Sequence, residues 1–168
     1  MIISFSSAKG GVSKTSSCVN LAYALTNIIA QKRVLVVDLD PQCGATHHLS
    51  ARFNRTFKAT IYEVVTKKCA PRYAIHEYAP NFFLLPASTL FRKITLSEFE
   101  KDLQNIVSQI KGEYELVFFD LAPSMYSGST VPLFFSDYVI VPVNCPQGLS
   151  LLGLQAQAEI IVEVRREK

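Results

Sequence analysis

Five runs of apolar residues, separated by stretches with helical character, constrain the fold of this chain more than any other feature. The runs are continuous rather than alternating, which is typical of strands buried on both faces of a parallel sheet. They cover residues 2–6, 33–40, 82–87, 115–122 and 138–144. Helix-compatible stretches lie at about residues 15–31, 59–67, 96–111, 127–135 and 148–165. This alternation predicts an α/β fold in which helices cover both faces of a doubly wound, mostly parallel sheet.

The composition fits one globular domain. The chain has 168 residues, of which 49% are hydrophobic and 18% are charged, so a single domain with a substantial core is expected over residues 1–168. The first residues lack the basic segment and the long apolar stretch of a signal peptide or membrane span. No C-x-x-C spacing, which would indicate a metal site or iron–sulfur cluster, occurs among Cys18, Cys43, Cys69 and Cys145. A cytoplasmic location is therefore expected.

Positive charge gathers in residues 50–80, the least regular part of the sequence. The net charge of the whole chain is +3, which supports only weak, salt-sensitive attraction to nucleic acid. A solvated surface is the main interpretation of this segment, and a face that binds nucleic acid or a protein partner is the alternative. Its positive residues are Arg52, Arg55, Lys58, Lys67, Lys68 and Arg72.

Residues 9–16 form the most informative motif. They read Lys-Gly-Gly-Val-Ser-Lys-Thr-Ser between a predicted strand and a predicted helix, which is the context of a phosphate-binding loop. Glycines let the backbone approach an anion, N–H groups point at phosphate oxygens, and Lys14 adds a full positive charge. The Thr15 hydroxyl is a suitable ligand for Mg²⁺. The candidate nucleotide-binding residues are Lys9, Gly10, Gly11, Val12, Ser13, Lys14, Thr15 and Ser16.

Two residues depart from the general pattern G-x-x-x-x-G-K-[ST]. Ser13 stands at the position of the second glycine, and Lys9 is an additional lysine at the start of the loop. If the backbone at Ser13 requires a positive φ, serine costs on the order of 1–2 kcal/mol there. That cost weakens the motif match without excluding phosphate binding.

Three aspartates lie at the ends of predicted strands. Asp38 and Asp40 close the second strand and, being two residues apart, face the same side of an extended chain. Asp120 follows Leu-Val-Phe-Phe, and a carboxylate after such an apolar run requires a cation. Because ligands bind at the carboxyl ends of parallel strands, these aspartates are expected beside the loop. Turn-forming or helix-capping aspartates are the alternative.

Four motifs together resemble those of the ParA-type partition ATPases of the deviant Walker A class, which are relatives of MinD. They are KGGVSKTS, VLVVDLDPQCGAT, LVFFDLAPS and YVIVPVNCPQGLSLLGL, and they cover nearly the whole chain. The resemblance implies a P-loop NTPase fold and an ATPase that uses ATP and Mg²⁺. It also implies an ATP-sandwich homodimer, non-specific binding to DNA of the nucleoid, and a ParB-like activator protein in the segregation of plasmid or chromosomal DNA.

The resemblance also implies roles for individual residues. Lys9 would reach across the dimer to the phosphates held by the other subunit, while Lys14 would hold phosphates within its own subunit. Asp40 would orient the attacking water, which makes Lys9, Lys14 and Asp40 the candidate catalytic residues. Thr15, Asp38 and Asp120 would serve the Mg²⁺ ion, Asp120 through water and Asp38 from beside the coordination shell.

Family members extend well past the position of Lys168, so the chain is expected to be truncated at its C-terminus. A MinD-like positioning ATPase is an alternative function, but it requires a membrane-targeting amphipathic helix. The last predicted helix, residues 148–165, is apolar around most of its circumference, so it is expected to pack in the core and no membrane partner is expected. A nucleotide-binding or dimerisation module without turnover is the alternative from a different class.

Overall fold

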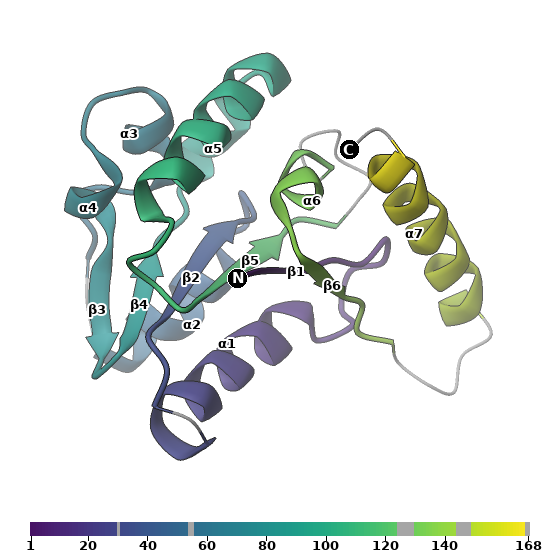
Figure 1. Ribbon diagram of the computed structural model, residues 1–168, viewed down its shortest axis with the longest axis horizontal. Helices are drawn as coiled ribbons and strands as arrows, with labels where there is room; N and C mark the ends of the chain where they lie inside the picture. The colour runs from purple at the N-terminus through teal and green to yellow at the C-terminus, as the bar shows by residue number, and fades with distance from the viewer. Residues whose placement is uncertain (30, 54–55, 124–129, 144–148, 167–168) are drawn as a thin grey trace.

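Six strands form one sheet in the order β3-β4-β2-β5-β1-β6, which runs from left to right in Figure 1. The computed structural model describes residues 1–29, 31–53, 56–123, 130–143 and 149–166. All neighbouring strands are parallel except β3 and β4, which are antiparallel. The predicted doubly wound, mostly parallel sheet is therefore confirmed. The strands are β1 Ile2–Phe5, β2 Val34–Leu39, β3 His76–Ala79, β4 Phe82–Leu85, β5 Leu116–Leu121 and β6 Tyr138–Ile140.

Helices cover both faces of this sheet, and β2 explains why the apolar runs are continuous. Val34 and Val36 belong to the core formed with α1 and α2, whereas Leu35, Val37 and Leu39 belong to the core formed with α3, α5 and α6. Both sets must therefore be apolar. The helices are α1 Lys14–Ala24, continued by a π-helical turn Leu25–Ile29, α2 Gly44–Phe53, α3 Ile61–Val65, α4 Pro71–Ala74, the 3-10 helix η2 Thr89–Lys93, α5 Leu96–Ile110, α6 Val131–Phe135 and α7 Leu149–Arg166.

Four elements were not predicted: β3, α2, α4 and η2. They are short or depend on contacts with distant residues, so local patterns carry little signal for them. The helix predicted at 59–67 is shorter because Thr60 caps α3 in a reciprocal pair with Glu63. The strand predicted at 138–144 ends at Ile140. Residues 124–129 and 144–148, which include parts of three predicted elements, lie outside the described residues.

The expectation that the last helix packs in the core holds only in part, through Val164 and the partly buried Ile160 and Ile161. Of the described side chains of α7, only Gln157 and Val164 are buried, while Leu154 and Val162 are 37% and 49% exposed. The physical reason is position, because α7 lies beyond β6 at the outer end of the sheet (Figure 1) and turns only one side toward the protein. Within the described part of the chain, no helix combines the length and the apolarity that crossing a membrane requires.

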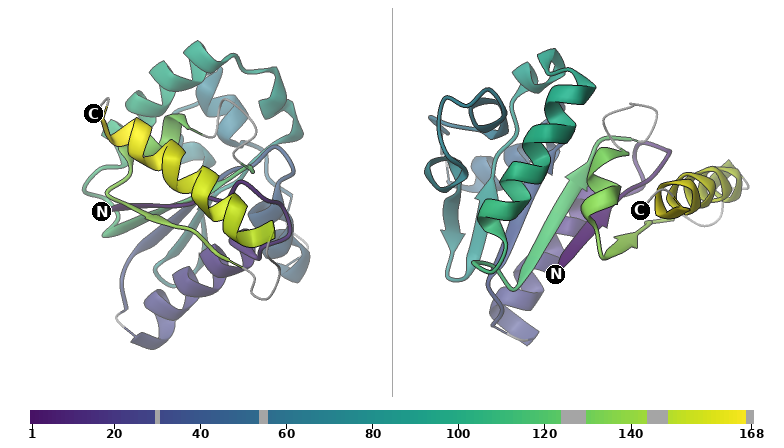
Figure 2. Two further views of the ribbon diagram at one scale, coloured as in Figure 1. Left: turned by 90° about the vertical axis from the view of Figure 1, so that its right-hand side faces the viewer. Right: turned by 45° about the horizontal axis from the view of Figure 1, so that its top comes forward.

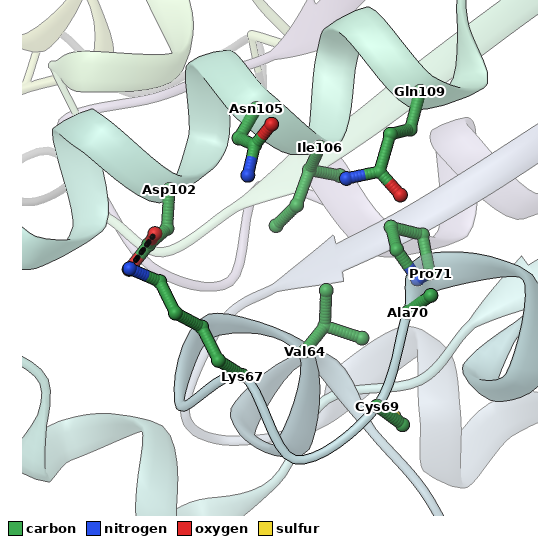
Figure 3. A pocket seen from close by; sticks show the side chains of 9 residues that line it. All are labelled: Val64, Lys67, Cys69, Ala70, Pro71, Asp102, Asn105, Ile106 and Gln109. Carbon is green, nitrogen blue, oxygen red and sulfur yellow. Dashed lines mark ion pairs between the residues drawn. The ribbon is translucent and has the colours of Figure 1, made fainter.

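The basic segment 50–80 borders a hollow between α3, α4 and α5 (Figure 3). Across this hollow, Lys67 Nζ lies 3.7 Å from Asp102 Oδ1. Lys68 and Arg72 lie over tyrosine rings, at 5.0 and 4.9 Å from the ring centroids. These local contacts favour the interpretation of the segment as surface. No candidate site residue lines the hollow, which is formed by Val64, Lys67, Cys69, Ala70, Pro71, Asp102, Asn105, Ile106 and Gln109.

Candidate phosphate and magnesium site

The carboxyl ends of β1, β5 and β2 bring the candidate residues together. Phe5, the last residue of β1, pairs with Asp120 of β5, and Asp120 pairs with Asp38 of β2. The glycine-rich loop leaves β1 at this edge, and Lys14 begins α1. Residues more than 100 positions apart in sequence therefore meet because adjacent parallel strands end there.

The glycine-rich loop contains two residues with a positive φ, Gly11 and Ser13. Gly11 has a φ of 75°, and Ser13 has a φ of 61° and a ψ of 27°, in the left-handed region. Ser13 is the N-cap of α1 but makes no capping hydrogen bond through its side chain, and the first turn of α1 contains no acidic residue. Since a helix N-terminus carries a partial positive charge and orphan N–H groups, this end of α1 favours an anion.

Asp120 and Lys14 form the electrostatic centre of the site. Lys14 Nζ lies 3.5 Å from Asp120 Oδ1, and the Lys14 side chain is only 8% exposed. Burial raises the pKa of Asp120, while the charge of Lys14 and the side chain of Thr15 act in the opposite direction. Among the described residues, neither carboxylate oxygen of Asp120 has a hydrogen-bond partner. A buried carboxylate in this condition suits a second cation.

Asp38 is fully buried and holds three segments in place. Its Oδ2 accepts hydrogen bonds from Thr46 N at 2.8 Å and Thr46 Oγ1 at 2.7 Å, and its Oδ1 accepts one from Asp40 N at 3.1 Å. Thr46 Oγ1 in turn accepts a hydrogen bond from Ala87 N at 2.8 Å. Burial and, second, the charge of Asp120 raise the pKa of Asp38 to about 7. Asp38 therefore orders the start of α2 and the chain after β4 as well as facing Asp120.

Thr46 and Gly44 are the positioning residues that sequence reasoning missed. Thr46 links Asp38 to the chain after β4, as described above. A Cβ at Gly44 would lie 3.1 Å from Thr15 Oγ1, so glycine lets α2 begin directly against that hydroxyl. Both residues follow Asp40 within six positions, and this nearby pair of small residues is the signal that could have identified them.

Asp40, directly after β2, is buried, whereas Lys9 lies at the surface. Asp40 is 7% exposed, and its Oδ1 accepts a hydrogen bond from Gln42 N at 2.8 Å. The Lys9 side chain is exposed, and its backbone N–H donates to Ser7 Oγ at 3.3 Å. The two lysines of the motif thus differ in environment, because Lys14 is buried against Asp120 and Lys9 faces solvent.

The oxygen atoms of Thr15 and Asp120 suit a Mg²⁺ ion that is also bound by phosphate oxygens and waters. Within the ranges that the structure describes, no group of three or more His, Cys, Asp or Glu side chains could enclose a metal ion. The Thr15 hydroxyl and the Asp120 carboxylate are close enough for Thr15 to influence the pKa of Asp120. Mg²⁺ prefers one or two protein oxygens combined with waters and phosphate oxygens, so Thr15 and Asp120 suffice. Asp38, whose oxygens both accept hydrogen bonds, suits a place beside the ion.

Comparisons with known proteins agree with this geometry. A family model described as an AAA domain matches residues 1–168. A virulence plasmid ParA family protein of Chlamydia psittaci is 30% identical over 91% of this chain and 60% of its own length. The chain spans about three fifths of the length of the curated relatives it matches.

Solved structures share the fold. A plasmid partition protein from Borrelia burgdorferi bound to AMPPNP has a TM-score of 0.85 and 23% identity, covering 98% of this chain and 69% of that one. A cobyrinic acid a,c-diamide synthase from Mycobacterium smegmatis, with bound ADP and magnesium, has a TM-score of 0.84 and 26% identity. That match covers 98% of this chain and 68% of that one. At 23% identity the Borrelia protein supports the fold alone.

The left-handed backbone at Ser13 predicts the effect of glycine. Ser13→Gly is expected to raise the free energy of unfolding by about 0.5–1 kcal/mol, because glycine adopts this φ without the Cβ clash. No capping hydrogen bond is lost. The matched control, Ser16→Gly, lies inside the first turn of α1 and should lower that free energy by several tenths of a kcal/mol. Urea denaturation of nucleotide-free protein measures both, and a destabilised Ser13→Gly variant would contradict the strain argument.

The raised pKa of Asp38 predicts a pH dependence of stability. In the folded protein Asp38 loses its proton near pH 7, whereas in the unfolded chain the carboxyl is already ionised at pH 6. The Asp38 contribution to stability is therefore present at low pH and should fall by about 1 kcal/mol between pH 6 and pH 8.

Urea denaturation at these two pH values measures the change. Asp38→Asn should remove this part of the pH slope. Glu98→Gln is the control, because hydrogen bonds from Thr95 lower the pKa of Glu98 and keep it ionised throughout. Equal slopes in the parent and Asp38→Asn proteins would refute the assignment.

Proposed function

The chain belongs to the AAA_31 family of AAA domains, and from that membership and the geometry of its site we propose that it binds ATP with Mg²⁺ and hydrolyses it in DNA partition. The resemblance of its motifs to ParA-type partition ATPases is confirmed by ParA family relatives. The single observation that carries the proposal is the meeting of Lys14, Thr15 and Asp120 at the ends of β1 and β5. The chain covers only part of its relatives, so the whole protein's activity is part of the proposal.

Phosphate binding follows from the glycine-rich loop and the N-terminus of α1. The loop amides and Lys14 would hold the β and γ phosphates, and the Lys14 ammonium is already aligned by Asp120. Because Lys14 is only 8% exposed, its attraction to a phosphate oxygen acts in a low-dielectric setting, where it is stronger than in water. The Lys14 side chain and the backbone amides of Gly10 and Gly11 would thus serve phosphate binding.

Thr15 and Asp120 would hold the Mg²⁺ ion, and Asp38 would add negative charge beside it. When bound, Mg²⁺ neutralises charge that develops on the transferred phosphoryl group. Among the described residues the Asp120 oxygens have an ion pair with Lys14 but no hydrogen-bond partner, which supports this assignment. Asp38 supports it through position, because its hydrogen bonds with Thr46 keep it in register with Asp120.

Asp40 would orient the water that attacks the γ-phosphate. Its backbone position is fixed by Asp38, which accepts the Asp40 N–H, and by Cys43, which donates to the Asp40 carbonyl at 2.7 Å. Phosphoryl transfer to water depends mainly on positioning and electrostatics, so a carboxylate held in this way fits the task.

Lys9 would complete the site of a second copy in an ATP-sandwich dimer. Its exposed side chain supports this role, since Lys14 already serves the phosphates within the same chain. A positive charge supplied across an interface is worth roughly 10³–10⁵ in rate in other phosphoryl-transfer enzymes. Hydrolysis should therefore be slow until dimerisation, and we propose non-specific DNA and a ParB-like DNA-bound protein as the partners that stimulate it.

Two substitutions separate binding from hydrolysis. Lys14→Ala should weaken binding of a fluorescent ATP analogue with Mg²⁺ by about 100-fold, because it removes a buried charge that contacts phosphate. Asp40→Ala should leave that affinity within about threefold and reduce phosphate release at least about 100-fold. Lys32→Ala is the matched control, because Lys32 is an exposed lysine paired with Glu115 at 2.6 Å.

The outcomes distinguish the candidate functions. Phosphate release is measured with and without double-stranded DNA, and the parent protein should release phosphate slowly alone and faster with DNA. An Asp40→Ala protein that hydrolyses ATP at the parental rate would overturn the role of Asp40. Tight binding by the parent protein without any phosphate release would favour the module without turnover. Absence of binding would refute the proposed function altogether.

A further inference from the structure

Two buried serines connect β1 to the helices beyond it. Ser4 Oγ lies 2.6 Å from Ser136 Oγ, at the end of α6. Ser6, the residue directly after β1, accepts a hydrogen bond from Gln157 Nε2 of α7 at 3.0 Å. The side chains of Ser4, Ser6 and Gln157 are all fully buried. Hydroxyl groups inside a sheet of apolar residues therefore mark polar links to α6 and α7.

Gln157 is the buried anchor for the first described half of α7. Among the side chains described at residues 153–159, Gln157 alone is buried, and Leu154 is 37% exposed. Among the described side chains of α7, the apolar contacts come later, where Ile160 and Val164 join the core. Because a buried amide is costly without hydrogen bonds, the bond to Ser6 contributes to how this half of α7 is placed.

Ser6 stands at the entrance to the phosphate loop. The next residue, Ser7, accepts a hydrogen bond from the backbone N–H of Lys9. A small hollow separates the loop from α7, with Ser7, Lys9 and Val12 on the loop side and Gly153 and Leu154 on the helix side. Figure 2 (left) shows α7 passing close to the loop that follows β1. The loop and α7 are therefore neighbours joined by a hydrogen bond behind the hollow.

We propose that Gln157 is a positioning residue whose hydrogen bond to Ser6 couples occupation of the phosphate loop to the placement of α7. The inference rests on the proposed nucleotide binding and adds an element that responds to it. Coupling is reciprocal, so a nucleotide that orders α7 is itself bound more tightly when α7 is in place. The exposed residues of α7, which include Leu154 and Val162, would then present a surface that depends on the nucleotide.

Hydrogen exchange of the α7 amides tests the coupling in the 168-residue chain. Exchange is measured with and without Mg²⁺ and a non-hydrolysable ATP analogue, and the ratio of the two rates is the readout. In the parent protein the analogue should slow α7 exchange roughly fivefold or more. Gln157→Met keeps the length of the side chain but removes the donor, so the ratio should fall below about twofold. Ser6→Ala removes the other partner and should have the same effect.

The ratio separates coupling from simple structural support. If Gln157 only stabilises the fold, Gln157→Met would speed α7 exchange equally with and without the analogue and leave the ratio unchanged. Gln155→Met is the matched control, because Gln155 is an exposed glutamine on the same helix that contacts Glu159 at 3.4 Å. It should keep the parental ratio.

Binding of the analogue, measured in parallel, distinguishes the two proposals. The affinity of Gln157→Met should fall by no more than the factor by which its exchange ratio falls, as reciprocity requires. A parent protein that binds the analogue with no change in α7 exchange would overturn this inference alone. A parent protein that binds no analogue would overturn both the inference and the proposed function.

Discussion

Asp38 and Asp120 occupy paired positions on neighbouring strands, and both side chains are fully buried. Two negative charges on neighbouring strands repel each other in a low-dielectric setting. Each carboxylate therefore requires a compensating charge or hydrogen bonds. Lys14 forms an ion pair with Asp120, while Asp38 accepts hydrogen bonds from Thr46 and Asp40. Contacts with these two carboxylates therefore position the loop and the start of α1, through Lys14, and the start of α2, through Thr46.

This constraint explains which parts of the molecule could be predicted from the sequence. The central strands are apolar on both faces, so β2 and β5 are visible as continuous runs, and the loop is visible because its glycines and Lys14 lie together. The start of α2 is fixed by Thr46 binding to Asp38, a contact between a helix and the end of a strand. The sequence of residues 44–53 carries no periodic pattern that indicates this contact, so α2 was not predicted. β3 was missed for the related reason that a half-buried edge strand depends on its partner β4.

For the site, the sequence indicated the residues but not how they lie relative to one another. Lys14, Thr15 and Asp120 could be identified because each has a distinctive residue type at a distinctive position along the chain. Their mutual geometry could not, since the pairing of β1 with β5 joins residues far apart in sequence. The error at α7 has a different origin. An apolar circumference predicts burial only when the helix is surrounded, and α7 has the edge of the sheet on one side.

The order of the strands also has a consequence for the assembly of the chain. β1 lies between β5 and β6, whose residues follow more than 100 positions later in the sequence. The glycine-rich loop after β1 therefore gains its structural support only when segments that are distant in sequence come together. Contacts of such long sequence separation are slow to form, because the intervening chain must lose its freedom first. The geometry of the loop is thus completed late in folding, although the loop itself is a short local segment of the sequence.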